Sequence, residues 1–222
     1  MKLKPIHALC LPWLLAARAL HAGASLYVDD AGTTPEGHCQ VESWTRVHAP
    51  GQEWSMLPAC TRRGVEYSLG VNRFGRAGET LFTRGIKHTL RDPEGQAWGV
   101  ALSFGAAWNA RRGRLDGWSA NLPVTLVLDA QGQTRLHVNV GWNKPRGAHG
   151  TPTGGLGLQR RLGGRWSLLA ETYADGHGDP AWQLGTRASF GEAVSVDLLL
   201  GCTPDRQHGR WFTLGLNVAL PD

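Results

Sequence analysis

The chain has few sulfur-containing residues, no second long apolar run and no cluster of basic residues. Of its 222 residues, four are cysteine and two are methionine. Beyond the N-terminal region, no apolar run approaches the roughly 20 residues that a transmembrane helix needs, which argues against a helical membrane protein. Lysine and arginine do not cluster among stacking aromatic residues, so we expect no nucleic-acid partner.

Motifs for catalysis and for ligand binding are also lacking. The chain has no Gly-x-Ser-x-Gly elbow. The glycines of residues 154–157 precede no helix, which excludes a nucleotide fingerprint. Residues 175–179 lack the spaced oxygen ligands of a calcium loop. We therefore expect no catalytic residue, no metal site and no cofactor.

The N-terminus has the pattern of a secretory leader. Lys2 and Lys4 precede an apolar run over residues 6–20, and Ala22-Gly23-Ala24 offers a small-residue cleavage site. We predict a signal peptide over residues 1–24; an uncleaved anchor is the alternative. Cleavage would lower the formal charge from +5 to +2, because three basic residues and no acidic residue are removed.

The rest of the chain is rich in glycine and tryptophan and alternates between apolar and polar residues. It contains 30 glycines and 10 tryptophans, a composition that suits many short strands and turns. Residues 98–108 are typical: Trp98, Leu102, Phe104 and Trp108 share one parity, while small and polar residues occupy the other. A strand sends these two sets to opposite faces, as expected when lipid lies outside and a polar lumen inside.

The alternation and the turn residues divide the mature chain into about twelve strands. We place them near 38–48, 53–62, 64–74, 80–91, 98–110, 117–129, 134–144, 153–163, 166–175, 181–190, 194–203 and 210–220. The even-numbered connections are short, whereas the odd-numbered ones tend to be longer and more charged. An outer-membrane barrel with both termini in the periplasm has this asymmetry.

Aromatic residues fall at strand ends on the apolar parity. Indole rings prefer the boundary between lipid headgroups and hydrocarbon, so we predict two aromatic girdles. The girdle residues are Trp98, Trp108, Trp118, Trp142, Trp166, Trp182 and Phe190. The alternative is a β-sandwich core, which would hold its tryptophans in mid-strand.

Charged residues on the polar parity would face the lumen. These lumen-lining candidates are Glu66, Arg135, His137, Glu171, Arg187 and Asp197. They either pair across a plugged lumen or line a water-filled path that selects solutes. Arg84 and His88 break the pattern by sharing a face with apolar residues, and a β-bulge is the cheapest explanation.

Three cysteines follow the predicted cleavage site. Cys39 and Cys60 flank a turn near residues 48–51 at similar distances, so a hairpin would place them opposite each other, close enough for a disulfide. Two free thiols are the alternative. Cys202 has no partner nearby in the sequence.

The stretch Tyr27-Val28-Asp29-Asp30-Ala31-Gly32-Thr33-Thr34-Pro35-Glu36-Gly37 precedes a strand with a glutamate, Glu42. It resembles the opening of proteobacterial outer-membrane barrels of the phenol meta-degradation pathway type. This resemblance implies a porin-like or transport-related role.

Together these patterns predict a signal peptide over 1–24, an N-terminal periplasmic segment over 25–37 and an outer-membrane β-barrel over 38–222. Our first hypothesis is a passive channel for small-molecule solutes, in contact with outer-membrane lipid and inserted by the barrel-assembly machinery. The second is a non-conducting structural or interaction barrel. The third is a lipid-modifying enzyme that pairs Ser103 or Ser119 with His88 or His137.

Overall fold

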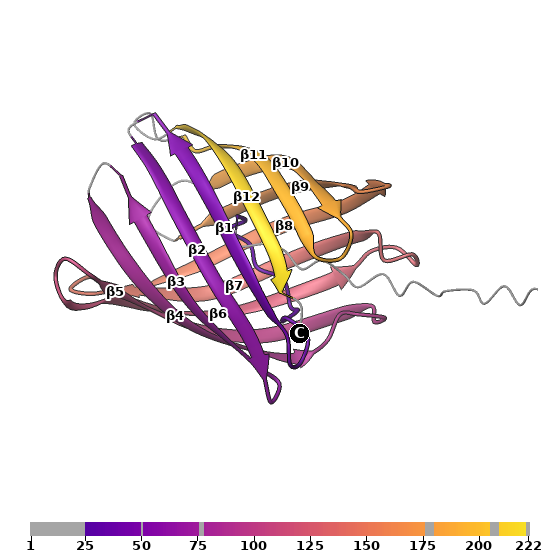
Figure 1. Ribbon diagram of the computed structural model, residues 1–222, viewed down its shortest axis with the longest axis horizontal. Coiled ribbons are helices and arrows are strands. Elements are labelled where there is room, and N and C mark those ends of the chain that lie inside the picture. Colours follow the sequence, from indigo (N-terminus) through magenta and orange to yellow (C-terminus); the bar gives the residue numbers. More distant parts are fainter. Residues whose placement is uncertain (1–24, 50, 76–77, 176–179, 205–208, 221–222) are drawn as a thin grey trace, which may run out of the picture.

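Twelve antiparallel strands close into a single barrel in the computed structural model (Figure 1). The structure describes residues 25–49, 51–75, 78–175, 180–204 and 209–220. The strands are β1 (Cys39–His48), β2 (Gly51–Arg62), β3 (Val65–Phe74), β4 (Glu79–Arg91), β5 (Trp98–Asn109), β6 (Arg114–Val127), β7 (Thr134–Pro145), β8 (Thr151–Gly163), β9 (Trp166–Ala174), β10 (Ala181–Phe190), β11 (Val194–Cys202) and β12 (Arg210–Leu220). Each strand pairs with its neighbours in sequence, and β1 pairs with β12 to close the ring.

The outer wall of the barrel is apolar and the inner wall is polar. Among the residues that the structure describes, thirty large hydrophobic side chains are exposed, including Leu69, Val140 and Leu200 at 61%, 63% and 68%, whereas the buried set is mostly polar or charged. This is the reverse of a water-soluble domain and is the distribution of a barrel surrounded by lipid. No helix among the described residues is long and apolar enough to cross a membrane.

The predicted fold class is confirmed, and most strand ends agree with the prediction within two residues. The largest difference is at β6, which begins at Arg114 rather than residue 117. A register shift pairs Ala107 with Gly117 but Trp108 with Leu115, so Asp116 bulges out and the ladder continues past it. The predicted signal peptide lies outside the described residues.

The bulge expected in the fourth strand exists, but it does not remove the two unusual residues from the outer face. The register shifts between Thr89 and Arg91, beyond both Arg84 and His88, and both remain exposed on the outer wall. His88 contacts the Gly64 carbonyl through Nδ1 at 2.6 Å. Because polar groups cost least near the ends of a barrel, where they reach water, this contact at a hairpin turn accounts for His88.

The N-terminal segment is where the structure corrects the sequence interpretation. Residues 25–37 were expected to lie in the periplasm outside the barrel, but most of this stretch lies inside the ring of strands, where its indigo trace is visible in Figure 1. Val28 and Ala31 are 1% and 0% exposed. The expectation was wrong because the polar partners of this segment are distant in sequence. We call residues 25–37 the inner segment.

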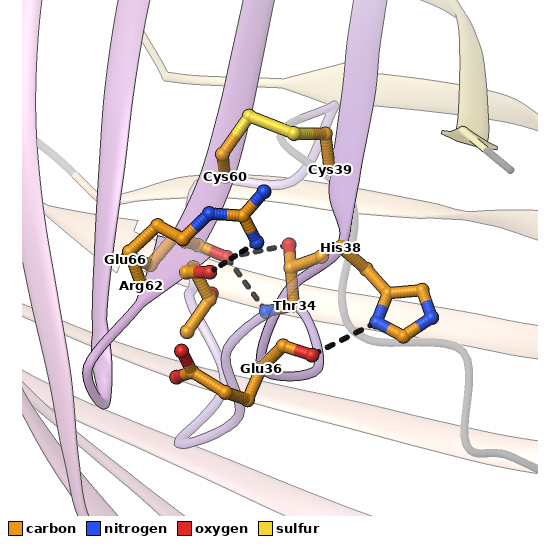
Figure 2. Close-up of a disulfide and its surroundings, with 8 residues drawn as sticks. Thr34, Glu36, His38, Cys39, Cys60, Arg62 and Glu66 are labelled. Atoms are coloured by element: carbon orange, nitrogen blue, oxygen red, sulfur yellow. Dashed lines mark hydrogen bonds between the residues drawn. A yellow bond between two sulfur atoms is a disulfide. The ribbon is translucent and has the colours of Figure 1, made fainter. Parts of the chain in front are cut away.

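The inner segment leaves the lumen beside a disulfide that joins the first hairpin (Figure 2). Cys39 and Cys60 are register partners on β1 and β2, with Cα atoms 4.1 Å apart, and their sulfur atoms are bonded. The predicted disulfide is therefore confirmed, and Cys202 is a free, exposed cysteine. The crosslink fixes the start of β1, and with it the point where the inner segment is attached.

A carboxylate anchors the same end of the inner segment to the next hairpin turn. Glu36 accepts hydrogen bonds from the backbone N–H groups of Arg63 and Gly64, at 2.7 and 2.8 Å. Both turn residues have positive φ, 55° and 74°, as a tight two-residue hairpin requires. The two N–H donors hold the pKa of Glu36 below its ordinary value.

Removing the disulfide should weaken the barrel without preventing its formation. We expect the double variant Cys39→Ser, Cys60→Ser to lose about 1–3 kcal/mol of unfolding free energy, because the crosslink closes a loop with a sequence separation of 21. Urea unfolding in lipid vesicles measures the change. Cys202→Ser is the matched control and should be neutral; equal stability of the double variant and the wild type would contradict the prediction.

The anchor at Glu36 should make local stability depend on pH. Its depressed pKa means that its contribution is present at neutral pH and is lost as the pH falls through that pKa. Hydrogen exchange of the Arg63 and Gly64 amides should therefore be faster in Glu36→Gln than in the wild type at neutral pH. The two proteins should converge in acid. A difference that persists at low pH would rule out the carboxylate as its cause, and Glu192→Gln in another turn is the control.

Candidate functional site

The lumen is the candidate functional site, and the inner segment divides it. The segment begins against β11 and β12. Ser25 donates from Oγ to Asp197 at 2.5 Å, and its carbonyl accepts from Arg46 and Gln183 at 3.3 and 3.1 Å. Asp197 in turn receives two hydrogen bonds from Arg187, at 2.6 and 2.7 Å. This fully buried ion pair therefore holds the first described residue of the segment in place.

The next turn of the segment is held by Glu171 on β9. Its carboxylate accepts the backbone N–H groups of Tyr27 and Val28, each at 2.9 Å. Gln183 on β10 donates to the same carboxylate at 3.0 Å. The ring of Tyr27 stacks on Tyr173 with a centroid distance of 5.6 Å. The Arg46 guanidinium also lies over the Tyr27 ring, 4.2 Å from its centroid, in a cation–π contact.

The Val28 side chain packs against two glycines of the barrel wall, where a larger residue would collide with it. A Cβ on Gly155 would lie 2.7 Å from the Val28 side chain, and one on Gly157 would lie 3.2 Å from it. Both glycines are on β8, facing the lumen. The absence of side chains there lets the inner segment approach the barrel wall closely.

The middle of the inner segment follows the wall from β7 to β4. Asn139 accepts from the Asp29 N–H at 2.9 Å and donates to the Asp29 carbonyl at 2.7 Å, as an adjacent strand would. Thr125 accepts from the Ala31 N–H, and Thr89 donates to its carbonyl, both at 2.9 Å. These side chains supply the hydrogen bonds that the irregular backbone cannot make with itself.

Charged side chains on β4 and β3 hold the last part of the inner segment. Lys87 on β4 lies 2.8 Å from the Asp29 carboxylate and 3.5 Å from that of Asp30. Glu66 on β3 accepts from both the N–H and the hydroxyl of Thr34, each at 2.7 Å (Figure 2). The inner segment thus touches strands around most of the barrel before it becomes β1.

The part of the lumen lined by β3 to β6 contains small residues and open space. A cavity of about 420 Å³ is lined by Thr83, Gly85, Gly105, Ala107 and Ser119, among others. A second cavity, of about 280 Å³, lies between this wall and the inner segment. The two share Ser68, Gly85, Gly105 and Ser119, so they adjoin along the lumen. The inner segment and the buried charges fill the opposite side.

The six lumen-lining candidates are not equivalent. Glu171, Arg187, Asp197 and Glu66 hold the inner segment or its anchors, as described above. His137 is buried, and its Nδ1 is 3.0 Å from the Thr125 hydroxyl that receives the Ala31 N–H. Arg135 lies apart from these residues, at the end of β7, and pairs with Glu94 in the β4–β5 connection at 2.7 Å.

Some residues of the site were not among the lumen-lining candidates. Lys87 lies in a strand whose alternation is irregular, and Glu42 was noted in the sequence only as part of the motif that precedes and begins the first strand. Trp211 falls on the wrong parity for the lipid face because it points inward, where its indole N–H donates to Gln183 at 2.8 Å. The seven girdle candidates, in contrast, are all exposed on the outer wall, between 43% and 54%.

The geometry does not assemble a hydrolytic site from the histidines considered. Within the described residues, no hydrogen bond joins His88 or His137 to a serine: His88 contacts the Gly64 carbonyl and His137 contacts Thr125. What the lumen contains is two adjoining cavities beside the inner segment.

Solved structures share this fold. The KdgM porin in complex with disordered oligogalacturonate aligns with a TM-score of 0.68 and 8% identity, over 82% of this chain and 99% of that chain. The NanC porin aligns with a TM-score of 0.64 and 7% identity, over 82% and 100%. The outer-membrane protein Omp33 of Acinetobacter baumannii aligns with a TM-score of 0.53 and 10% identity, over 83% and 98%. At these identities the likeness establishes the fold of outer-membrane porins.

No curated protein sequence matches the chain. One family model does, over residues 10–220, and the chain therefore belongs to the family described as uncharacterised conserved protein UCP029691.

Proposed function

We propose that the protein is a passive outer-membrane channel of a Gram-negative bacterium that conducts small polar solutes past its inner segment. The observation that carries this proposal is the pair of adjoining cavities along β3 to β6, of about 420 and 280 Å³. Glycine, alanine and serine on this wall leave space that larger side chains would fill.

The likeness to porins supports the same function. KdgM was solved with oligogalacturonate, so a barrel of this shape holds a soluble solute in that protein. The motif of residues 27–37 resembles barrels of the phenol meta-degradation type, which adds a transport-related role. No cofactor takes part in such a mechanism, and the chain performs no chemistry on its solute.

The orientation in the membrane forms part of the proposal. The strand ends Cys39 and Leu220 are register partners, at the same end as the short connection after Arg62. Porin-type barrels turn their short connections toward the periplasm, which places both termini there after removal of the signal peptide. The exposed tryptophans then form the girdles in contact with lipid, and insertion requires the barrel-assembly machinery.

A non-conducting structural barrel is the second candidate, and the inner segment is the observation that favours it. The segment is hydrogen-bonded to side chains from β3, β4, β6, β7, β9, β10 and β11 and blocks one side of the lumen. The two candidates differ in one measurable property, ionic current through the folded protein.

Deleting part of the inner segment should widen the conducting path. We expect the purified protein to conduct in planar bilayers, and a variant that lacks residues 25–34 to conduct at least about twofold more, because the open cross-section grows. Heat-modifiable mobility in electrophoresis checks that both are folded. Absence of current from both folded proteins would favour the structural barrel, and equal conductance would show that the segment does not restrict flow.

A side chain introduced beneath Val28 should have a similar effect without a deletion. In Gly155→Val the new side chain overlaps Val28 and displaces the inner segment, so we expect higher or noisier single-channel conductance in a folded barrel. Gly154→Val is the matched control. A Cβ on Gly154 would contact only the Asn139 carbonyl oxygen, at 3.7 Å, and would not touch the inner segment. Identical traces from the two variants would contradict the prediction.

A further inference from the structure

The smaller cavity has an excess of negative charge. It lies between the inner segment and the inner faces of β1 to β6. Its lining includes the carboxylates of Asp29, Asp30, Glu42 and Glu66 but a single basic side chain, that of Lys87. Lys87 is engaged by the two aspartates of the inner segment, at 2.8 and 3.5 Å. This one basic side chain of the lining therefore faces four carboxylates.

Glu42 is the unusual member of this group. It is 8% exposed, yet no hydrogen bond or ion pair joins its carboxyl group to any other described residue. Glu66, by contrast, is satisfied by Thr34. The carboxyl oxygens of Glu42 are not among the fully buried polar atoms that lack a partner, so they reach the space of the cavity. A carboxylate with so little contact with water is costly, and a cation in the cavity would offset that cost.

The nearby arginines do not fill this role. Arg46, on the same face of β1, pairs with Glu53 at 3.3 Å. Arg187 is bound to Asp197 at 2.6 Å. Arg187 also interacts electrostatically with Glu42, but neither arginine lines the cavity. The lining itself therefore holds four carboxylates and one basic side chain.

We propose that this cavity is a binding site for a small organic cation, an ammonium or guanidinium group held between Glu42 and Glu66, and that it makes the channel cation-selective. The inference rests on the proposed channel function. Leu57 and Ala59 also line the cavity and suit the alkyl part of such a solute. Its volume of about 280 Å³ lies just below the usual range for drug-sized ligands, which favours a small molecule.

A metal ion is a poorer fit for the site. Among the residues that the structure describes, no group of three or more histidine, cysteine, aspartate or glutamate side chains is placed to hold a metal ion. Two carboxylates and apolar neighbours match an organic cation better, because its charge is spread and its hydration is weaker.

Reversal potentials in a methylammonium chloride gradient test the inference. The protein is reconstituted in planar bilayers as wild type, Glu42→Gln, Glu66→Gln and, as a matched control, Glu192→Gln in the exposed β10–β11 turn. We expect the wild type to favour methylammonium over chloride, and Glu42→Gln to lower the permeability ratio by about twofold or more. Glu192→Gln should match the wild type. Glu66 also binds Thr34, so Glu42→Gln is the decisive variant.

The outcomes separate the two proposals. Current with a cation preference that falls in Glu42→Gln supports both. Current that is unselective, anion-selective or unchanged in folded Glu42→Gln overturns the cation site and leaves the channel standing. Absence of current from every folded protein overturns the channel, and the cation-selective path with it. Should Glu42→Gln fail to fold, Glu42→Asp keeps the charge but shortens its reach, and an unchanged ratio in that variant and in Glu66→Gln would count against the site.

Discussion

Irregular backbone inside a closed barrel needs a partner for each polar group, and this requirement shapes the lumen. The barrel wall satisfies its own N–H and C=O groups through the strand ladder, so it has none to offer. Side chains must therefore supply the hydrogen-bond partners for the backbone of the inner segment. Glu171 takes two successive N–H groups, and Asn139 binds both polar groups of Asp29, so each acts as a short piece of strand for the inner segment.

Charges in the lumen follow from the same requirement. Arg187 pairs with Asp197, which accepts the hydrogen bond from Ser25, while the single positive charge of Lys87 is shared by the two aspartates of the segment. Among the described residues, no such hydrogen-bonded pair includes Glu42, whose carboxyl group lines the smaller cavity beside Lys87. The open part of the lumen thus has a chemical character that the filled part does not share.

The barrel could be predicted from the sequence because its main signal is local. In β5 and β12 the alternation of two parities and the glycine turns indicate strand, face and register within a few residues. The disulfide could be predicted for a similar reason, because Cys39 and Cys60 lie at similar distances on either side of one hairpin turn. The inner segment gave no such signal, because its small and polar residues look like a surface loop. Its partners lie far away in the chain, with Asp197 separated from Ser25 by 172 residues.

The position of the inner segment also bears on how the ring closes. The last pairing to form in a sequential barrel joins β1 to β12, whose residues are separated by nearly the whole chain, and bringing such distant strands together is entropically unfavourable. The segment is continuous with β1 and grips β10 and β11 from within, next to β12. It therefore joins β1 from within to the two strands that precede β12, so the chain crosses the seam of the barrel a second time, through the lumen.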